Sequence, residues 1–163
     1  MNKIAILCVE DESEVREAVL RDLKPFADAF RIEAAEDVND ARDVLKELAD
    51  DGVELGIALC DHMMPGESGV EFLVSLQNDE NYRDARKVLI TGQAGLEDTV
   101  RAVNEAKLHH YIAKPWKPEE LKEVVKKQLT DYVIDNVEDV MPFVAALDGP
   151  RLMAKIAETG ADK

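Results

Sequence analysis

The chain has 163 residues, of which 46% are hydrophobic, and this length is sufficient for one folded domain with a buried core. Acidic residues outnumber basic residues by 35 to 20, which gives a formal net charge of −15. A surface of this charge repels phosphate groups, so we expect no direct binding to nucleic acid and no docking on an anionic membrane. The first apolar run, Ile4 to Val9, is too short for a signal-peptide core or a membrane span. We therefore expect a soluble protein.

The two cysteines, Cys8 and Cys60, lie inside apolar runs. We expect buried, reduced thiols in the core rather than a disulfide, which favours a cytoplasmic location. No Cys-X-X-Cys or Cys/His cluster indicates a zinc site.

Short apolar runs alternate with segments of helical periodicity along most of the chain. The runs typical of buried strands are Lys3–Val9, Arg31–Ala35, Leu55–Cys60, Lys87–Thr91 and His110–Ala113. After each run, apolar residues recur at helical spacing, in segments that include Val15, Val38, Val70, Leu96 and Leu121. This alternation predicts an α/β fold: a doubly wound, flavodoxin-like, five-stranded parallel sheet of order 2-1-3-4-5.

We assign residues 1–130 to this domain and residues 131–163 to a C-terminal helical extension or linker. The fifth helix is expected to run on through Tyr132 and Val133 toward Asn136 and to cover the domain, with a dimer seam as the alternative. The residues that follow are too few for an independent domain. They form either a tail that packs or dimerises, or a truncated connection to an output domain.

Polar residues of complementary chemistry follow four of the predicted strands. Glu10 and Asp11 follow the first, Asp61 follows the third, Thr91 ends the fourth and Lys114 follows the fifth. Because parallel strands end at one edge of the sheet, these residues are expected to share one crevice. Two carboxylates about 4 Å apart repel by roughly 4 kcal/mol at an effective dielectric near 20. A hard divalent cation such as Mg²⁺ would offset this repulsion.

These groups are together suited to receiving a phosphoryl group. The Asp61 carboxylate would be the nucleophile. The metal, the Lys114 ammonium and the Thr91 hydroxyl would stabilise charge on the phosphoryl oxygens. Each residue alone is an ordinary turn or helix-cap feature, so the interpretation depends on their occurrence together at four strand ends.

The segments that carry these residues resemble the receiver domain of two-component response regulators. They are Ile6–Glu12, Asp61–Gly69, Val88–Gly92 and Tyr111–Trp116, which occur in the family's order. The resemblance implies that Asp61 is the phosphoacceptor. It also implies a Mg²⁺ site formed by Glu10, Asp11, Asp61 and the main-chain carbonyl of Met63.

The resemblance assigns further roles. Thr91 and Tyr111 would form the switch pair, Lys114 would contact the phosphoryl group, and the bond between Lys114 and Pro115 would be cis. A sensor histidine kinase or a phosphotransfer protein would supply the phosphoryl group. Phosphorylation would then reshape the face formed by the fourth helix, fifth strand and fifth helix. A homodimer could form through this face or through the C-terminal helices. We expect a signalling domain rather than an enzyme that turns over an external substrate.

Some positions depart from the common family pattern. Glu10 stands where many members have aspartate, and Trp116 where phenylalanine is frequent. Met63 and Gln93 occupy the two positions that tune the lifetime of the phosphoryl group in this family. The alternative to a phosphoacceptor is a degenerate receiver that acts as a phosphorylation-independent interaction module. An aspartyl phosphohydrolase is disfavoured because Met63 stands where such enzymes carry a second acid.

Three histidines invite a metal or phosphorelay interpretation. We expect His62, which follows Asp61, to point out of the crevice. For His109 and His110, which precede or begin the fifth strand, we expect a helix-end or loop role.

Overall fold

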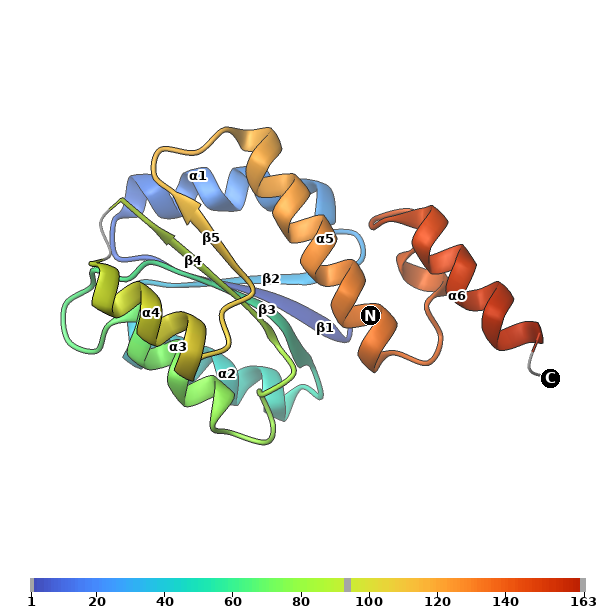
Figure 1. Cartoon of the computed structure of the whole chain (residues 1–163), viewed down its shortest axis with the longest axis horizontal. Coiled ribbons are helices and arrows are strands. Elements are labelled where there is room, and N and C mark those ends of the chain that lie inside the picture. Colours follow the sequence, from blue (N-terminus) through green and yellow to red (C-terminus); the bar gives the residue numbers. More distant parts are fainter. Residues whose placement is uncertain (1, 93–94, 162–163) are drawn as a thin grey trace.

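The computed structural model describes residues 2–92 and 95–161, and Figure 1 shows the arrangement of their helices and strands. The strands are β1 (Ile4–Val9), β2 (Arg31–Ala35), β3 (Glu54–Cys60), β4 (Arg86–Thr91) and β5 (His110–Ala113). The helices are α1 (Ser13–Leu23), α2 (Val38–Asp50), α3 (Gly69–Gln77), α4 (Leu96–Glu105), α5 (Pro118–Asn136) and α6 (Gly149–Ala161), with short 3-10 turns η1 (Lys24–Phe26) and η2 (Met141–Phe143). Within these described ranges, no helix is both long and apolar enough to cross a membrane.

All five strands are parallel and lie in the order β2-β1-β3-β4-β5, which confirms the predicted sheet. Helices α1 and α5 cover one face, and α2, α3 and α4 cover the other (Figure 1). Both faces of each central strand are therefore buried. This explains why the sequences of these strands are continuous apolar runs, in which apolar and polar residues do not alternate. The order also brings the ends of β1 and β3 side by side.

The hydrophobic core has two layers, one on each face of the sheet. Successive residues of β1 point into opposite layers: Cys8 packs with residues of α1 and α5, whereas Val9 packs with residues of α2 and α3. Cys60 lies in the same layer as Val9, so the two cysteines are separated by the sheet. Both thiols are buried and unpaired, as expected, and burial raises the pKa of Cys8 to about 12.

A one-residue irregularity occurs where β3 passes under α5. The register between β1 and β3 shifts at Gly56, which lies opposite no residue of β1. A Cβ atom at Gly56 would lie 2.6 Å from Cγ2 of Ile4 and 3.1 Å from Cδ2 of Leu129. Gly56 is therefore the extra residue of a β-bulge, and the lack of a side chain lets α5 pack directly on the sheet.

The C-terminal extension packs on the same core as the sheet. The ring of Phe143 lies 5.3 Å from the ring of Phe30, and Leu147 and Leu152 are buried in the layer that α1 and α5 cover. Residue 130, where we drew the domain boundary, falls inside α5, which continues to Asn136 as expected. Figure 1 shows α6 near the amino ends of the strands, away from the edge where the strands end.

Polar contacts also fix the extension to α5. The Nζ of Lys155 donates hydrogen bonds to the main-chain oxygens of Ile134 and Val137 at the end of α5. Arg151 donates to Asp131 at 2.8 Å. The cation of Lys155 thus satisfies carbonyl groups that the end of a helix leaves without partners.

Candidate functional site

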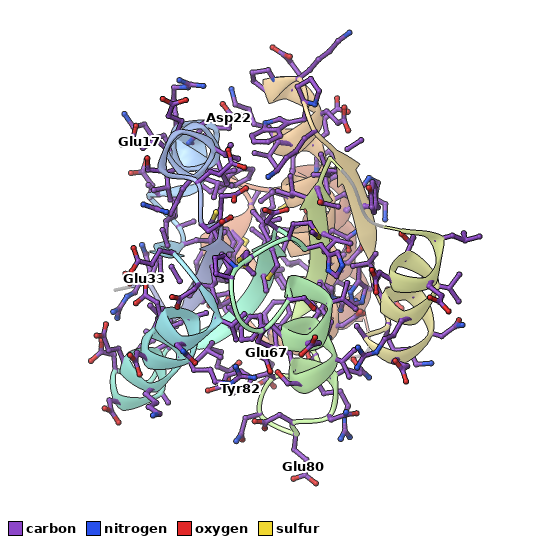
Figure 2. The ribbon with its side chains drawn as sticks, turned by 90° about the vertical axis from the view of Figure 1, so that its left-hand side faces the viewer. Glu17, Asp22, Glu33, Glu67, Glu80 and Tyr82 are labelled. Carbon is purple, nitrogen blue, oxygen red and sulfur yellow. The ribbon has the colours of Figure 1, made fainter. Side chains whose placement is uncertain are left out.

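Three of the predicted site residues form a carboxylate cluster where β1 and β3 end. Glu10 and Asp11 follow β1, and Asp61 follows β3. One oxygen from each of the three carboxylates lies within 4.8 Å of the other two. Glu10 and Asp61 are buried. Figure 2 looks onto this end of the molecule, with Asp22 on α1 and Glu67 beside α3.

Lys114 brings a positive charge into the cluster from the end of β5. Its Nζ lies 2.6 Å from Oε1 of Glu10 and 3.3 Å from Oδ2 of Asp61. The peptide bond between Lys114 and Pro115 is cis, as the resemblance implies. Burial opposes the charge of Lys114, but the hydrogen bond to Glu10 and the attraction of Asp61 outweigh this effect and raise its pKa. Lys114 is therefore a fixed cation at neutral pH.

Glu10 is held by main-chain and side-chain bonds. Its main-chain nitrogen donates to the oxygen of Ala35 at 3.0 Å, and its main-chain oxygen accepts from Arg16 at 2.8 Å. Its Oε2 accepts from the main-chain nitrogen of Glu12 at 3.2 Å. Burial raises the pKa of Glu10 to about 7, although the hydrogen bond from Lys114 opposes this rise. The raised pKa means that the ionised form of Glu10 is only partly compensated by Lys114, so a bound cation would stabilise this carboxylate further.

The donor set fits a hard divalent cation. Three carboxylates and one ammonium leave an excess of negative charge at this edge of the sheet. Among the residues that the structure describes, Oδ1 of Asp11 is buried without a hydrogen-bond partner. Such an atom costs about 1–3 kcal/mol unless it gains a partner. Oxygen ligands without nitrogen or sulfur are the ones that Mg²⁺ prefers.

The two predicted switch residues are neighbours on adjacent strands. Thr91 is buried at the end of β4, and Tyr111 is half-buried on β5. The phenol of Tyr111 donates a 3.3 Å hydrogen bond to the main-chain oxygen of Thr91. Gln93 lies outside the described residues, and the side chain of Met63 is exposed.

None of the histidines joins a group of metal ligands within the described part of the chain. His62 is buried, and its Nε2 lies 3.1 Å from Oδ2 of Asp98 on α4. His109 precedes β5 and accepts a 3.0 Å hydrogen bond at Nδ1 from the main-chain nitrogen of Lys87. His110 is exposed at the start of β5.

Sequence reasoning missed two residues that support the site from α1. Arg16 binds the main-chain oxygen of Glu10, and Asp22 accepts a 2.9 Å hydrogen bond from Nε1 of Trp116. A signal for Asp22 was present, because it falls on the buried side of α1 between Val19 and Leu23. A polar residue at such a position indicates a buried partner.

The sequence of the chain matches the response regulator receiver domain over residues 6–126. The chain belongs to the response regulator receiver family. This confirms the resemblance seen in the four motifs and, together with the parallel sheet, the assignment to two-component signal transduction.

Two curated relatives of this receiver domain are transcriptional regulators. The phosphate regulon transcriptional regulatory protein PhoB of Escherichia coli is 35% identical over 152 residues, which cover 91% of this chain and 63% of PhoB. The hydrogenase transcriptional regulatory protein HoxA of Bradyrhizobium diazoefficiens is 35% identical over 127 residues, which cover 78% of this chain and 24% of HoxA. The chain therefore spans less than two thirds of either relative.

Solved structures share the receiver fold. An uncharacterized protein from Neptuniibacter caesariensis is 26% identical with a TM-score of 0.71, covering 85% of this chain and 97% of its own. A CheY-like receiver domain protein from Methanospirillum hungatei has a TM-score of 0.70 at 24% identity, covering 83% of this chain and 100% of its own.

Proposed function

We propose that this receiver domain accepts a phosphoryl group on Asp61 from the phosphohistidine of a sensor histidine kinase or a phosphotransfer protein. Mg²⁺ would be held by Glu10, Asp11 and Asp61, with the main-chain carbonyl of Met63 as a further ligand. The observation that carries the proposal is the position of Lys114, whose Nζ lies 3.3 Å from Asp61 inside a cluster of three carboxylates. With a divalent cation bound by the three carboxylates, the cation and Lys114 together would supply the positive charge that a dianionic phosphoryl group needs.

In the proposed transfer, a carboxylate oxygen of Asp61 forms a bond to phosphorus while the bond from phosphorus to the donor's imidazole nitrogen breaks. The imidazole nitrogen leaves with the electron pair and takes up a proton. Bound Mg²⁺ would neutralise charge on the phosphoryl oxygens. Lys114 would bind one of these oxygens, and Thr91 would offer its hydroxyl from the end of β4. The domain would thus change its own covalent state without turning over an external substrate.

The proposed output is the face formed by α4, β5 and α5. Because Tyr111 donates to the main-chain oxygen of Thr91, a shift of Thr91 toward a phosphoryl group would change the position of Tyr111. Helix α4 also exposes an apolar stripe, with Leu96 81%, Val100 47% and Val103 51% exposed. An apolar stripe of this kind is suited to binding a partner or a second copy. Size-exclusion chromatography with and without beryllofluoride would detect phosphorylation-dependent dimerisation.

The decisive test is labelling with acetyl phosphate. Wild-type protein incubated with acetyl phosphate and Mg²⁺ should gain the mass of one phosphoryl group, and Asp61→Asn or an excess of EDTA should prevent this gain. Equal labelling of Asp61→Asn would contradict the assignment of the phosphoacceptor. No labelling of the wild-type protein would instead favour a phosphorylation-independent interaction module.

A further inference from the structure

His62 links the end of β3 to helix α4. It follows Asp61 directly, and its side chain is only 7% exposed. Its Nε2 lies 3.1 Å from Oδ2 of Asp98, which stands in the first turn of α4 and is 49% exposed. Because a carboxylate only accepts hydrogen bonds, Nε2 is the donor. The residue next to the proposed phosphoacceptor is therefore bonded to a helix of the proposed output face.

The main chain at Asp61 and His62 has little freedom to move toward α3. The nitrogen of Gly69, the first residue of α3, donates a 3.1 Å hydrogen bond to the main-chain oxygen of His62. A Cβ atom at Gly69 would lie 1.9 Å from the main-chain oxygen of Asp61. The start of α3 is thus in direct contact with this peptide unit. A displacement at Asp61 is more readily passed on through the side chain of His62.

Helix α4 buries little of its surface, so one additional bond from the body of the domain matters for the position of its first turn. Within α4, all of whose residues are described, Ala102 is the only buried residue. The cap residue Gly95 provides no side-chain hydrogen bond to the first turn. The hydrogen bond between His62 and Asp98 therefore joins a lightly buried first turn of α4 to the end of β3.

We propose that His62 is a positioning residue that holds α4 in its unphosphorylated position through Asp98. This link would act in addition to the pair formed by Thr91 and Tyr111, and it rests on the proposed function at Asp61. Modification of Asp61 must then break or weaken the bond to Asp98 as α4 moves. The bond between His62 and Asp98 stabilises the unphosphorylated state, whereas a phosphoryl mimic stabilises the other state of the same equilibrium. Removing the bond therefore favours the state that binds the mimic.

The experiment compares two substitutions in the same turn of α4. Asp98→Ala removes the acceptor of the bond. Glu97→Ala removes an equivalent acid that has no side-chain hydrogen bond or ion pair with the described residues. Both lose the same favourable interaction with the helix dipole, so their difference isolates the bond. Each protein is titrated with beryllofluoride in the presence of Mg²⁺, and hydrogen exchange of the α4 amides is measured before and after saturation.

We expect Asp98→Ala to bind beryllofluoride about 3- to 10-fold more tightly than wild type, which corresponds to one hydrogen bond of ordinary strength. Its α4 amides should exchange faster before the mimic is added. Glu97→Ala should match the wild type in both measurements. If Asp98→Ala and Glu97→Ala bind equally, or Asp98→Ala binds more weakly, the proposal is wrong while the function at Asp61 stands. If the wild type does not bind the mimic, both proposals fail.

Substitutions at His62 provide the second half of the test. His62→Gln places an amide donor near the position of Nε2 and should behave as the wild type. His62→Met removes the donor, and combining it with Asp98→Ala should add no further change in affinity, because both remove one bond. Additive effects of the two substitutions would contradict the proposal. Should His62→Met fail to fold, Asp98→Ala still decides the question, since its side chain lies on the exposed side of the bond.

Discussion

Nε1 of Trp116 donates a 2.9 Å hydrogen bond to Oδ2 of Asp22, and this bond joins the segment that carries Lys114 to helix α1. Asp22 is buried, and Figure 2 shows it on the side of α1 nearest the segment between β5 and α5. Trp116 is the only tryptophan of the chain. Its fluorescence therefore reports on the segment that follows β5 and carries Lys114.

Replacing Asp22 with alanine should destabilise the domain. The substitution leaves the indole N–H of Trp116 without its partner, which costs about 1–3 kcal/mol. Urea unfolding followed by circular dichroism measures this loss, and the emission maximum of Trp116 should shift in the folded state. Asp22→Asn keeps an oxygen acceptor and serves as the control with a smaller loss. Unchanged stability and emission in Asp22→Ala would show that the bond is unimportant.

Replacing Lys114 with methionine should destabilise the domain through the charges that it leaves behind. Glu10 and Asp61 would lose their compensating cation, which costs about 2–3 kcal/mol for a partly exposed pair. The double variant with Asp61→Asn should recover much of this loss, because one of the repelling carboxylates is removed. Thermal unfolding of the two variants at neutral pH makes the comparison. A double variant less stable than Lys114→Met would contradict this account.

Mg²⁺ should stabilise the folded domain against heat and urea. For one site, free Mg²⁺ at ten times its dissociation constant adds about 1.4 kcal/mol to the free energy of unfolding. Asp11→Asn should weaken the effect, since Oδ1 of Asp11 is a buried carboxylate oxygen that has no hydrogen-bond partner among the described residues. NaCl at matched ionic strength is the control. An equal rise of the unfolding temperature in NaCl would indicate screening rather than a site.

Acid should destabilise the domain partly through His109. Burial, assisted by the charges of Arg86 and Lys87, lowers its pKa to about 4, and Nδ1 already accepts the hydrogen bond from the nitrogen of Lys87. In the unfolded chain the pKa is about 6.5, so between these values only the unfolded chain binds the proton. Stability is therefore complete above about pH 6.5 and falls as the pH drops toward 4, by about 1–3 kcal/mol from this residue.

This pH dependence can be tested by replacing His109 with a residue that accepts the same hydrogen bond but does not bind a proton in this pH range. His109→Asn places an amide oxygen near the position of Nδ1, and its stability should fall less steeply between pH 6.5 and 4. Urea midpoints for both proteins across this range give the two curves. Parallel curves would assign the acid sensitivity to other groups.

The C-terminal extension should contribute to the stability of the whole domain. Phe143 is 8% exposed and packs against Phe30, so Phe143→Ala should cost about 2–4 kcal/mol. Met141 lies in the same 3-10 turn but is 56% exposed, and Met141→Ala should change the free energy of unfolding by less than about 0.5 kcal/mol. A single unfolding transition in both variants would show that the extension and the sheet unfold together.

The strands and the residues at their ends could be predicted because periodicity and chemistry are local signals, and the strand order could be predicted from the connection rules of alternating α/β folds. Glu10, Asp61 and Lys114 are far apart in the sequence, yet the parallel sheet brings their strand ends to one edge. The packing of Phe143 on Phe30 could not be predicted in this way, because nothing in a short apolar patch identifies the surface that it covers. The hydrogen bond between His62 and Asp98 could not be predicted either, because it depends on where α4 lies relative to β3.

The bulge at Gly56 reverses the facing of every residue that follows it in β3. Leu55 lies in the layer beneath α2 and α3, and so do Ala58 and Cys60, although an uninterrupted strand would place residues of odd and even number on opposite faces. If odd and even residues simply alternated along β3, the residues at its end would face the opposite layers of the core. One missing side chain, five positions upstream of Asp61, thus decides toward which face its carboxylate is presented.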